Sequence, residues 1–355
     1  MENLPVSKMH LAQPGVVAAL LAALLFGAGT PLAKLLLTDL DPLLLAGLLY
    51  LGSGLGLTLV RRLRHAEPVR LAPGEWPWLA GAIMAGGIVA PVLLLLGLRH
   101  MPATGASLLL NAEGMFTALL AWFAFRENFD RRIALGMAAI MLGAVILSWP
   151  GELRFSGVWP ALAVLGACLA WGMDNNLTRK VSLSDASWIA AGKGLVSGVI
   201  NLGLAFALGV AHWPSLPDVS AAMLVGFAAY GVSLALFIVA LRHLGTARTG
   251  AYFSVAPFIG AVLAVALGEP ITWPLLVAGA LMALGVWLHL TEQHAHVHTH
   301  EPLSHEHWHA HDEHHQHEHD VPVAPGTRHR HPHSHAPITH SHVHFPDVHH
   351  RHRHS

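Results

Sequence analysis

The chain has 355 residues, of which 54% are apolar and only 12% are charged, and its formal net charge is −1. The mean hydropathy is +0.50 even though the C-terminal segment is very polar, which excludes an ordinary set of water-soluble domains. The single cysteine, Cys168, excludes an intrachain disulfide.

Apolar runs recur from residue 16 to residue 290, and each is close to the roughly 20 residues that cross a bilayer as a helix. We read the first run as a membrane span rather than a cleavable signal peptide, with residues 1–15 as a cytoplasmic N-terminus. The chain is therefore predicted to be an all-α integral membrane protein with ten transmembrane helices. The predicted spans are 16–37, 43–60, 76–98, 102–125, 133–149, 157–176, 186–210, 219–241, 248–267 and 271–290.

The loop cations predict the orientation of these helices. Alternate loops carry eleven Lys and Arg residues on one side and two on the other. Cytoplasmic loops are the ones that accumulate Lys and Arg. We therefore expect both termini to be cytoplasmic in a plasma membrane or bacterial inner membrane.

Polar landmarks repeat along the chain and divide it into two halves of five helices, 16–150 and 156–290. An offset of 145 residues relates Phe26-Gly27 and Lys34 to Trp171-Gly172 and Arg179. An odd number of helices per half means that the second half enters the membrane inverted, which is the usual construction of secondary transporters. The other matching landmarks are Leu98-Arg99-His100, Thr104-Gly105-Ala106 and Glu127 in the first half, and Leu241-Arg242-His243, Thr249-Gly250-Ala251 and Glu269 in the second.

These landmarks make residues 16–290 resemble the EamA-type members of the drug/metabolite transporter superfamily. The resemblance implies a central cavity lined by the first four helices of each half, and substrates such as amino acids, metabolites, drugs or sugar-linked compounds. Members often have a proline within the fourth helix of each half. The second half keeps Pro257, whereas the first has Glu113-Gly114 there. Pro31, Pro91 and Pro257 are expected to kink their helices and expose carbonyl groups.

Glu113 lies about halfway along its predicted span. An ionised carboxylate at that depth is costly unless it is paired or hydrated, so it is a candidate for proton or substrate coupling. The alternative is a structural carboxyl group that is bonded to Asn111 or to a neighbouring helix.

Other polar candidates for the transport cavity are Asp174, Lys193, Asn175, Asn176 and Lys34. By helical rise, Asp174 and Lys193 fall roughly 8–12 Å inside the cytoplasmic edge, so an ion pair between them is geometrically reasonable. Such a pair could equally be a static link between two helices. Lys34 lies near the outer end of its helix, where a long side chain can reach the interface.

The segment 291–355 holds 23 of the 29 histidines, mostly in His-x-His alternation, and has few apolar residues to bury. We expect it to be a disordered cytoplasmic tail that binds divalent transition metals such as Zn²⁺, Ni²⁺ or Co²⁺. The alternative is a polar tail without a metal-related role. The candidate ligands are His294, His296, His298, His300, His305, His307, His309, His311, His329, His331, His333, His335, His340, His342 and His344.

The sequence thus predicts a secondary transporter that moves a small solute by alternating access, with a divalent metal as one candidate substrate. The alternatives are an exporter of a small organic metabolite or amino acid, and a metal-responsive membrane sensor that does not transport. No enzymatic motif is present, and no cofactor is expected to be required. The expected partners are the bilayer, the solute and metal ions at the tail, with no nucleic acid and with the oligomeric state left open.

Overall fold

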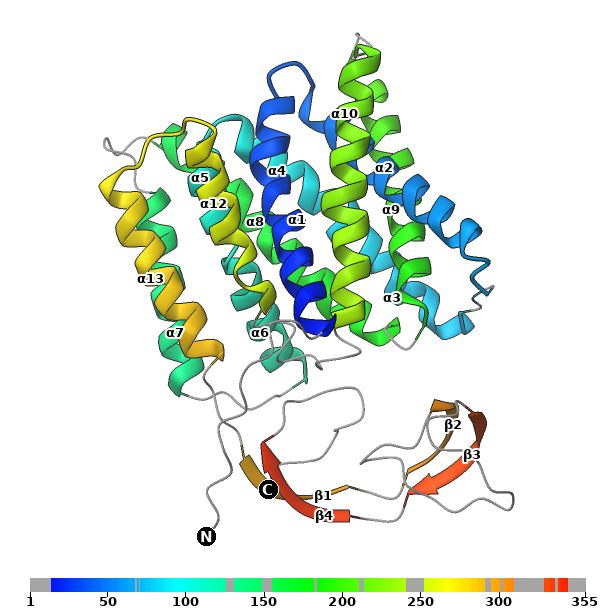
Figure 1. Cartoon of the computed structure of the whole chain (residues 1–355). Helices are drawn as coiled ribbons and strands as arrows, with labels where there is room; N and C mark the ends of the chain where they lie inside the picture. The colour runs from blue at the N-terminus through cyan, green and yellow to red at the C-terminus, as the bar shows by residue number, and fades with distance from the viewer. Residues whose placement is uncertain are drawn as a thin grey trace. The chain divides into compact units, whose positions relative to one another are not determined.

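The computed structural model forms two compact units, residues 1–292 and 293–355, and the first is almost entirely helical (Figure 1). The structure describes residues 14–67, 69, 71–125, 131–148, 155–181, 184–210, 214–240, 252–290, 295–300, 303–309, 329–335 and 338–343.

Polar caps and prolines set where several helices begin. Pro42 opens α2, and the Asp41 carboxylate accepts a hydrogen bond from the amide of Leu43; Asp185 caps α9 in the same way, and Ser215 caps α10. The helices are α1 Pro14–Leu36, α2 Pro42–Leu63, α3 Trp76–Ala82, α4 Ala90–Arg99, α5 Ala103–Leu109, α6 Ala112–Phe125, α7 Arg131–Ser148, α8 Phe155–Thr178, α9 Ala186–Ala207, α10 Leu216–Gly226, α12 Ala256–Ala266 and α13 Trp273–Leu290. Four short helices join them: η1 Pro73–Glu75, η2 Ile83–Val89, η3 Arg179–Val181 and η4 Phe227–Val232.

Six helical stretches in the described part of the chain are long and apolar enough to cross a membrane, and three shorter apolar helices accompany them. Residues 241–251, which include the start of the predicted ninth span (248–251), lie outside the described residues. The multi-pass helical class is therefore confirmed, and the count of ten crossings stays a prediction.

The third helix of each half contains a π-helical turn at an equivalent position. η2 (Ile83–Val89) lies between α3 and α4, and η4 (Phe227–Val232) interrupts the helix that runs from Leu216 to Ala240. A shift of 145 residues superimposes the two turns to within two residues at either end. The two halves therefore share this irregular backbone turn as well as their helices. π-Helical turns of this kind are frequent at functional sites.

The predicted single helix over 102–125 is wrong in one respect, because the structure breaks it. α5 ends at Leu109, Leu110 and Asn111 form a turn, and α6 starts at Ala112. The second half has the matching turn at Ser254–Val255, just before α12. Pro257 therefore lies in the first turn of α12, where proline is well tolerated, instead of kinking a helix interior.

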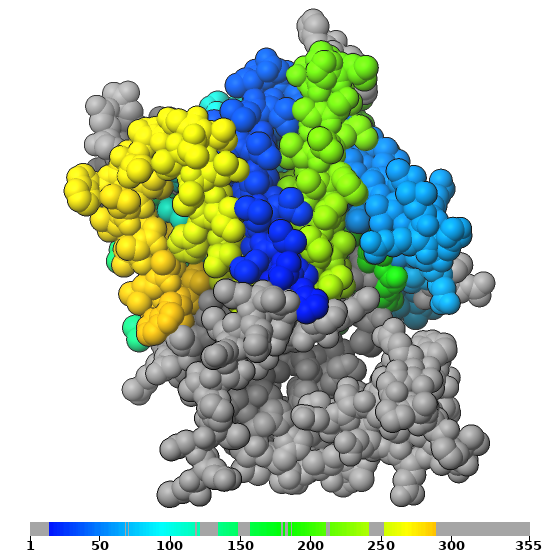
Figure 2. Space-filling view, in the orientation of Figure 1, coloured from blue at the N-terminus to red at the C-terminus, as the bar shows by residue number. Residues whose placement is uncertain are grey.

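Equivalent helices of the two halves pack against each other and run antiparallel. A β-carbon on Gly47 would meet Leu202, and one on Gly194 would meet Gly54, so α2 and α9 approach closely through small residues. A β-carbon on Gly143 would meet Met282, and one on Gly285 would meet Ile140, which places α7 against α13 in the same antiparallel sense. This is the packing that an inverted repeat requires. On the face in Figure 2, α1 is flanked by α10 and α12.

The second unit contains four strands, β1 Ala295–His300, β2 Leu303–His309, β3 His329–His335 and β4 Ile338–Val343. β1 pairs with β4 and β2 with β3, both antiparallel. The described tail segments are thus strands, and the disorder expected of the tail as a whole stays a prediction. The His-x-His alternation has the period of two that a strand also has, and paired strands satisfy the backbone without a hydrophobic core.

Candidate functional site

The break in the fourth helix of the first half positions Glu113. The amide of Glu113 donates to the carbonyl oxygen of Leu110 (3.0 Å). Asn111 is buried and its side-chain amide donates to the carbonyl oxygen of Leu108 (2.8 Å), so it stabilises the break and is not the partner of Glu113. Glu113 lies in the first turn of α6, where the exposed amides and the helix dipole favour a negative charge.

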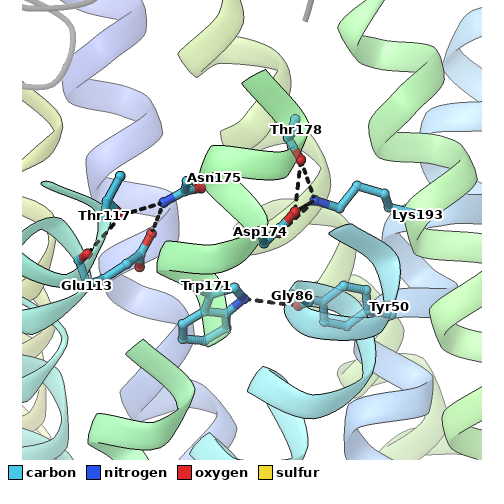
Figure 3. A network of polar contacts seen from close by, with 9 residues as sticks. All are labelled: Tyr50, Gly86, Glu113, Thr117, Trp171, Asp174, Asn175, Thr178 and Lys193. Carbon is cyan, nitrogen blue, oxygen red and sulfur yellow. Dashed lines mark hydrogen bonds and ion pairs between the residues drawn. The ribbon is translucent and has the colours of Figure 1, made fainter. Parts of the chain in front are cut away.

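The half-buried Glu113 side chain joins the two halves. Asn175 of α8 donates to Glu113 Oε1 (2.9 Å) and also lies 3.2 Å from Thr117 Oγ1 (Figure 3). Asn176 donates to the carbonyl oxygens of Thr117 (3.1 Å) and Gly172 (2.8 Å), and thereby fixes α8 against α6. The candidate carboxylate from one half is thus held by the Asn175 amide from the other.

The predicted contact between Asp174 and Lys193 is present. Lys193 Nζ of α9 lies 2.6 Å from Asp174 Oδ2 of α8, and the hydroxyl of Thr178 donates to Asp174 Oδ1 (2.8 Å). The side chains of Lys193 and Asp174 are only 14% and 9% exposed, so each charge depends on the other for compensation. In Figure 3 this pair and the Glu113–Asn175 pair extend from different sides of α8.

The π-turn η2 contributes two carbonyl groups, as Pro91 leads one to expect. Pro91 has no N–H to donate, and the amide of Ala90 donates to the carbonyl oxygen of Ala85. The carbonyl oxygens of residues 86 and 87 therefore need donors from outside the helix. Side chains supply them. The hydroxyl of Tyr50 (2.7 Å) and the indole N–H of Trp171 (3.0 Å) donate to the oxygen of Gly86, and Asn201 donates to that of Gly87 (3.0 Å).

Aromatic rings continue from this turn toward α1 and α12. The ring centroid of Tyr50 lies 5.5 Å from that of Tyr230, which lies 6.1 Å from that of Phe26. Phe26 in turn lies 5.4 Å from Phe253. The charged groups therefore come from α6, α8 and α9, whereas η4, α1 and the segment before α12 contribute aromatic surface.

Lys34, the remaining cavity candidate, belongs to a different cluster. Its ammonium group donates to the carbonyl oxygens of Leu98 (2.6 Å) and Met101 (3.0 Å) at the end of α4. The side chain therefore binds helix-terminal carbonyl groups. It does not belong to the Glu113 network, the name used here for the residues labelled in Figure 3. A separate pocket of about 300 Å³ lies near that end, and its lining includes Met101, Thr104 and Pro270 but none of the residues drawn in Figure 3.

Five residues drawn in Figure 3 were not predicted as site residues: Gly86, which contributes its carbonyl group, and the side chains of Tyr50, Thr117, Trp171 and Thr178. The two threonines follow Glu113 and Asp174 by four residues, a spacing that places them on the same helix face and could have indicated them. Tyr50 and Trp171 had no such signal, because their donors are directed at a backbone carbonyl whose availability depends on the π-turn.

Within the described residues, no group of three or more His, Cys, Asp or Glu could hold a metal ion. Of the candidate ligands in the tail, His294, His311 and His344 lie outside the described residues. The others lie on the four strands. The register makes Cα partners of His296 and His342, His298 and His340, His305 and His333, His307 and His331, and His309 and His329.

Known proteins match this chain in a pattern that agrees with its two halves. The model of the EamA-like transporter family matches residues 13–149 and 158–291. An uncharacterized transporter of Methanothermobacter thermautotrophicus is 28% identical over 292 residues, which cover 77% of this chain and 85% of that protein. A probable amino-acid metabolite efflux pump of Salmonella typhimurium is 28% identical over 174 residues, 46% of this chain and 52% of that protein.

A crystal structure at 19% identity has the same fold, with a TM-score of 0.59 over 77% of this chain and 95% of that one. The family match in both halves agrees with the repeated π-turns, the repeated helix breaks and the antiparallel packing of equivalent helices. The chain belongs to the EamA-like transporter family.

Proposed function

We propose that the protein is a secondary-active transporter that moves a small solute across the plasma membrane by alternating access, with both termini in the cytoplasm. The observation that carries the proposal is the Glu113 network at the broken fourth helix. Broken helices with free termini, located where two inverted halves meet, are the places where transporters bind solutes and coupling ions. Glu113 and Asn175 come from opposite halves, so a relative movement of the halves changes the surroundings of the carboxylate.

We assign the coupling role to Glu113 and a supporting role to the Asp174–Lys193 pair. Asp174 has a cation at 2.6 Å, whereas the ion pairs among the described residues do not include Glu113. A membrane carboxylate without a fixed counter-ion is one that a proton or a cationic group of a solute can neutralise. Asp174, already neutralised by Lys193, is suited to hold α8 and α9 in place.

The test is transport by the purified protein in proteoliposomes, with and without a pH gradient. The Glu113→Gln variant keeps the shape and the hydrogen bond to Asn175 but cannot exchange a proton. We expect it to lose gradient-driven accumulation and to retain exchange of solute between the two sides. Glu75→Gln is the matched control, because Glu75 accepts a bond at a helix start outside the network. Normal gradient-driven accumulation by Glu113→Gln contradicts the assignment.

For the substrate, we favour a small organic metabolite or amino acid over a metal ion. The printed description of the Salmonella typhimurium relative, a probable amino-acid metabolite efflux pump, supports this class. The described network offers amide, hydroxyl and aromatic groups, which suit an organic solute. Counterflow with a panel of labelled amino acids and divalent metals distinguishes the two classes.

We also propose that the histidine-rich tail binds Zn²⁺, Ni²⁺ or Co²⁺ without being part of the transport path. The five His–His partner positions support this, since cross-strand partners have Cβ atoms about 4.5–5.5 Å apart and can serve one ion. Each pair would supply two ligands, fewer than the four of a structural zinc site, so the ions should exchange readily.

Titration calorimetry of the full-length protein, compared with a truncation after Glu292, tests the tail. We expect several ions per chain to bind only when the tail is present, and to dissociate as the pH falls through about 6, because protonated imidazole does not ligate metals. Equal metal binding by the truncated protein contradicts the proposal. The truncation should leave solute flux unchanged, whereas a metal substrate would make flux depend on the tail.

A further inference from the structure

Lys34, at the C-terminal end of α1, binds the end of a neighbouring helix. Its ammonium group donates to the carbonyl oxygens of Leu98 (2.6 Å), Met101 (3.0 Å) and Arg99 (3.3 Å), where α4 ends. The last carbonyl groups of a helix have no intrahelical donors and carry the negative end of the helix dipole. The lysine therefore satisfies three acceptors with one positive charge.

Glu269, which follows α12 in the second half, makes the complementary contact with the next helix. Its Oε1 accepts from the amide of Ala103 (2.6 Å), and its Oε2 accepts from the amide of Thr104 (2.7 Å). These are the first two amides of α5, which have no intrahelical acceptors. Charge-assisted hydrogen bonds of this kind are roughly twice as strong as neutral ones.

The two contacts hold one short turn from opposite sides. Residues 100–102 connect α4 to α5, with the lysine on the preceding carbonyl groups and the glutamate on the following amides. Leu98, Ala103 and Thr104 are buried on either side of the turn. Because Glu269 comes from the other half, any movement of the α4–α5 turn away from α12 must break its two hydrogen bonds.

We propose that Lys34 and Glu269 form a clamp on the α4–α5 turn that keeps this face of the transporter closed, and that the clamp must open for the solute to pass at this face. Lys34 and Glu269 are positioning residues, since neither belongs to the Glu113 network. The proposal rests on the proposed transport cycle. The loop cations predict that the clamped face is the extracytoplasmic one.

Accessibility of a buried cysteine tests the clamp without any knowledge of the substrate. Ser107 of α5 is 1% exposed and lies against Gly260 of α12, one turn beyond the clamp. In a Cys168→Ser background, Ser107→Cys reports opening through its reaction with a membrane-impermeant maleimide, applied separately to each side of oriented vesicles. The experiment uses the full-length chain.

We expect Lys34→Met and Glu269→Gln each to raise the labelling rate about tenfold from the clamped side, the change that a loss of about 1.4 kcal/mol produces. The matched control is Asp39→Asn, which removes a charge at the same end of the helices without touching the clamp, and it should leave the rate unchanged. Lys34→Arg, which keeps the charge, should restore protection.

An unchanged labelling rate in both clamp variants, or an equal rise in the Asp39→Asn control, overturns the proposal. A lower melting temperature with unchanged protection means that the two residues act on stability alone, and also overturns it. If a clamp variant does not fold, Glu269→Asp, which keeps the charge but shortens the reach, gives the same comparison. The readout is independent of flux, so its failure is distinct from a failure of the proposed transport function.

Discussion

Removal of one partner of the Asp174–Lys193 pair should cost far more stability than removal of both. The two side chains are 9% and 14% exposed and their atoms lie 2.6 Å apart. Lys193→Met leaves a nearly buried carboxylate whose remaining side-chain donor is the hydroxyl of Thr178 (2.8 Å). An uncompensated buried charge costs about 3–5 kcal/mol. The double variant Asp174→Asn, Lys193→Met carries no charge there, and we expect it to lie within about 1.5 kcal/mol of the wild type.

The free energy of unfolding of the four proteins can be measured by denaturation with SDS in mixed micelles, and the coupling between the two sites follows from the double-mutant cycle. The expected coupling is favourable and amounts to several kcal/mol. Single variants that each cost less than about 1 kcal/mol, with no coupling, would refute the reasoning. That result means that water reaches both charges, as it would in a solute cavity that opens between α8 and α9.

Gly86→Ala should destabilise the protein by about 1–3 kcal/mol in the same assay, because its β-carbon would overlap the carboxylate of the buried pair, whereas Gly203→Ala, with open space around it, should be neutral. Asp185→Asn keeps a good N-cap for α9 but removes the carboxylate charge that Arg61 contacts at 2.9 Å, and it should cost up to about 1 kcal/mol. Its hydrogen bonds hold the pKa of Asp185 below the ordinary value despite partial burial. The wild type should therefore exceed the variant in free energy of unfolding by the whole amount above about pH 4. This difference should vanish as the pH falls through the lowered pKa. Reporter fusions after residue 290 and within 211–218 should report opposite sides of the membrane, and the same side for both would refute the predicted topology.

Much of the fold was predictable because a small number of physical rules govern helices in membranes. Length and apolarity located the helices, and the matching landmarks predicted two related halves before any contact was known. The Asp174–Lys193 contact was predictable as well, since a helix rises by a fixed amount per residue and depth follows from position. Glu113 stood out as a carboxylate in an apolar run, although its partner did not.

The sequence by itself determined the fold class, the two-half organisation and the residues whose charge is out of place in a membrane. Only the tertiary structure decided what those residues contact. The break at Leu110–Asn111 and the π-turn that frees the carbonyl of Gly86 depend on neighbouring helices, which supply Asn175, Tyr50 and Trp171. Lys34 likewise could have reached the interface, and it binds α4 because that helix ends beside it. The physical reason is common to these cases. A backbone group left without its helical partner inside a membrane must find a donor or acceptor in space, and the sequence does not state which helix will provide it.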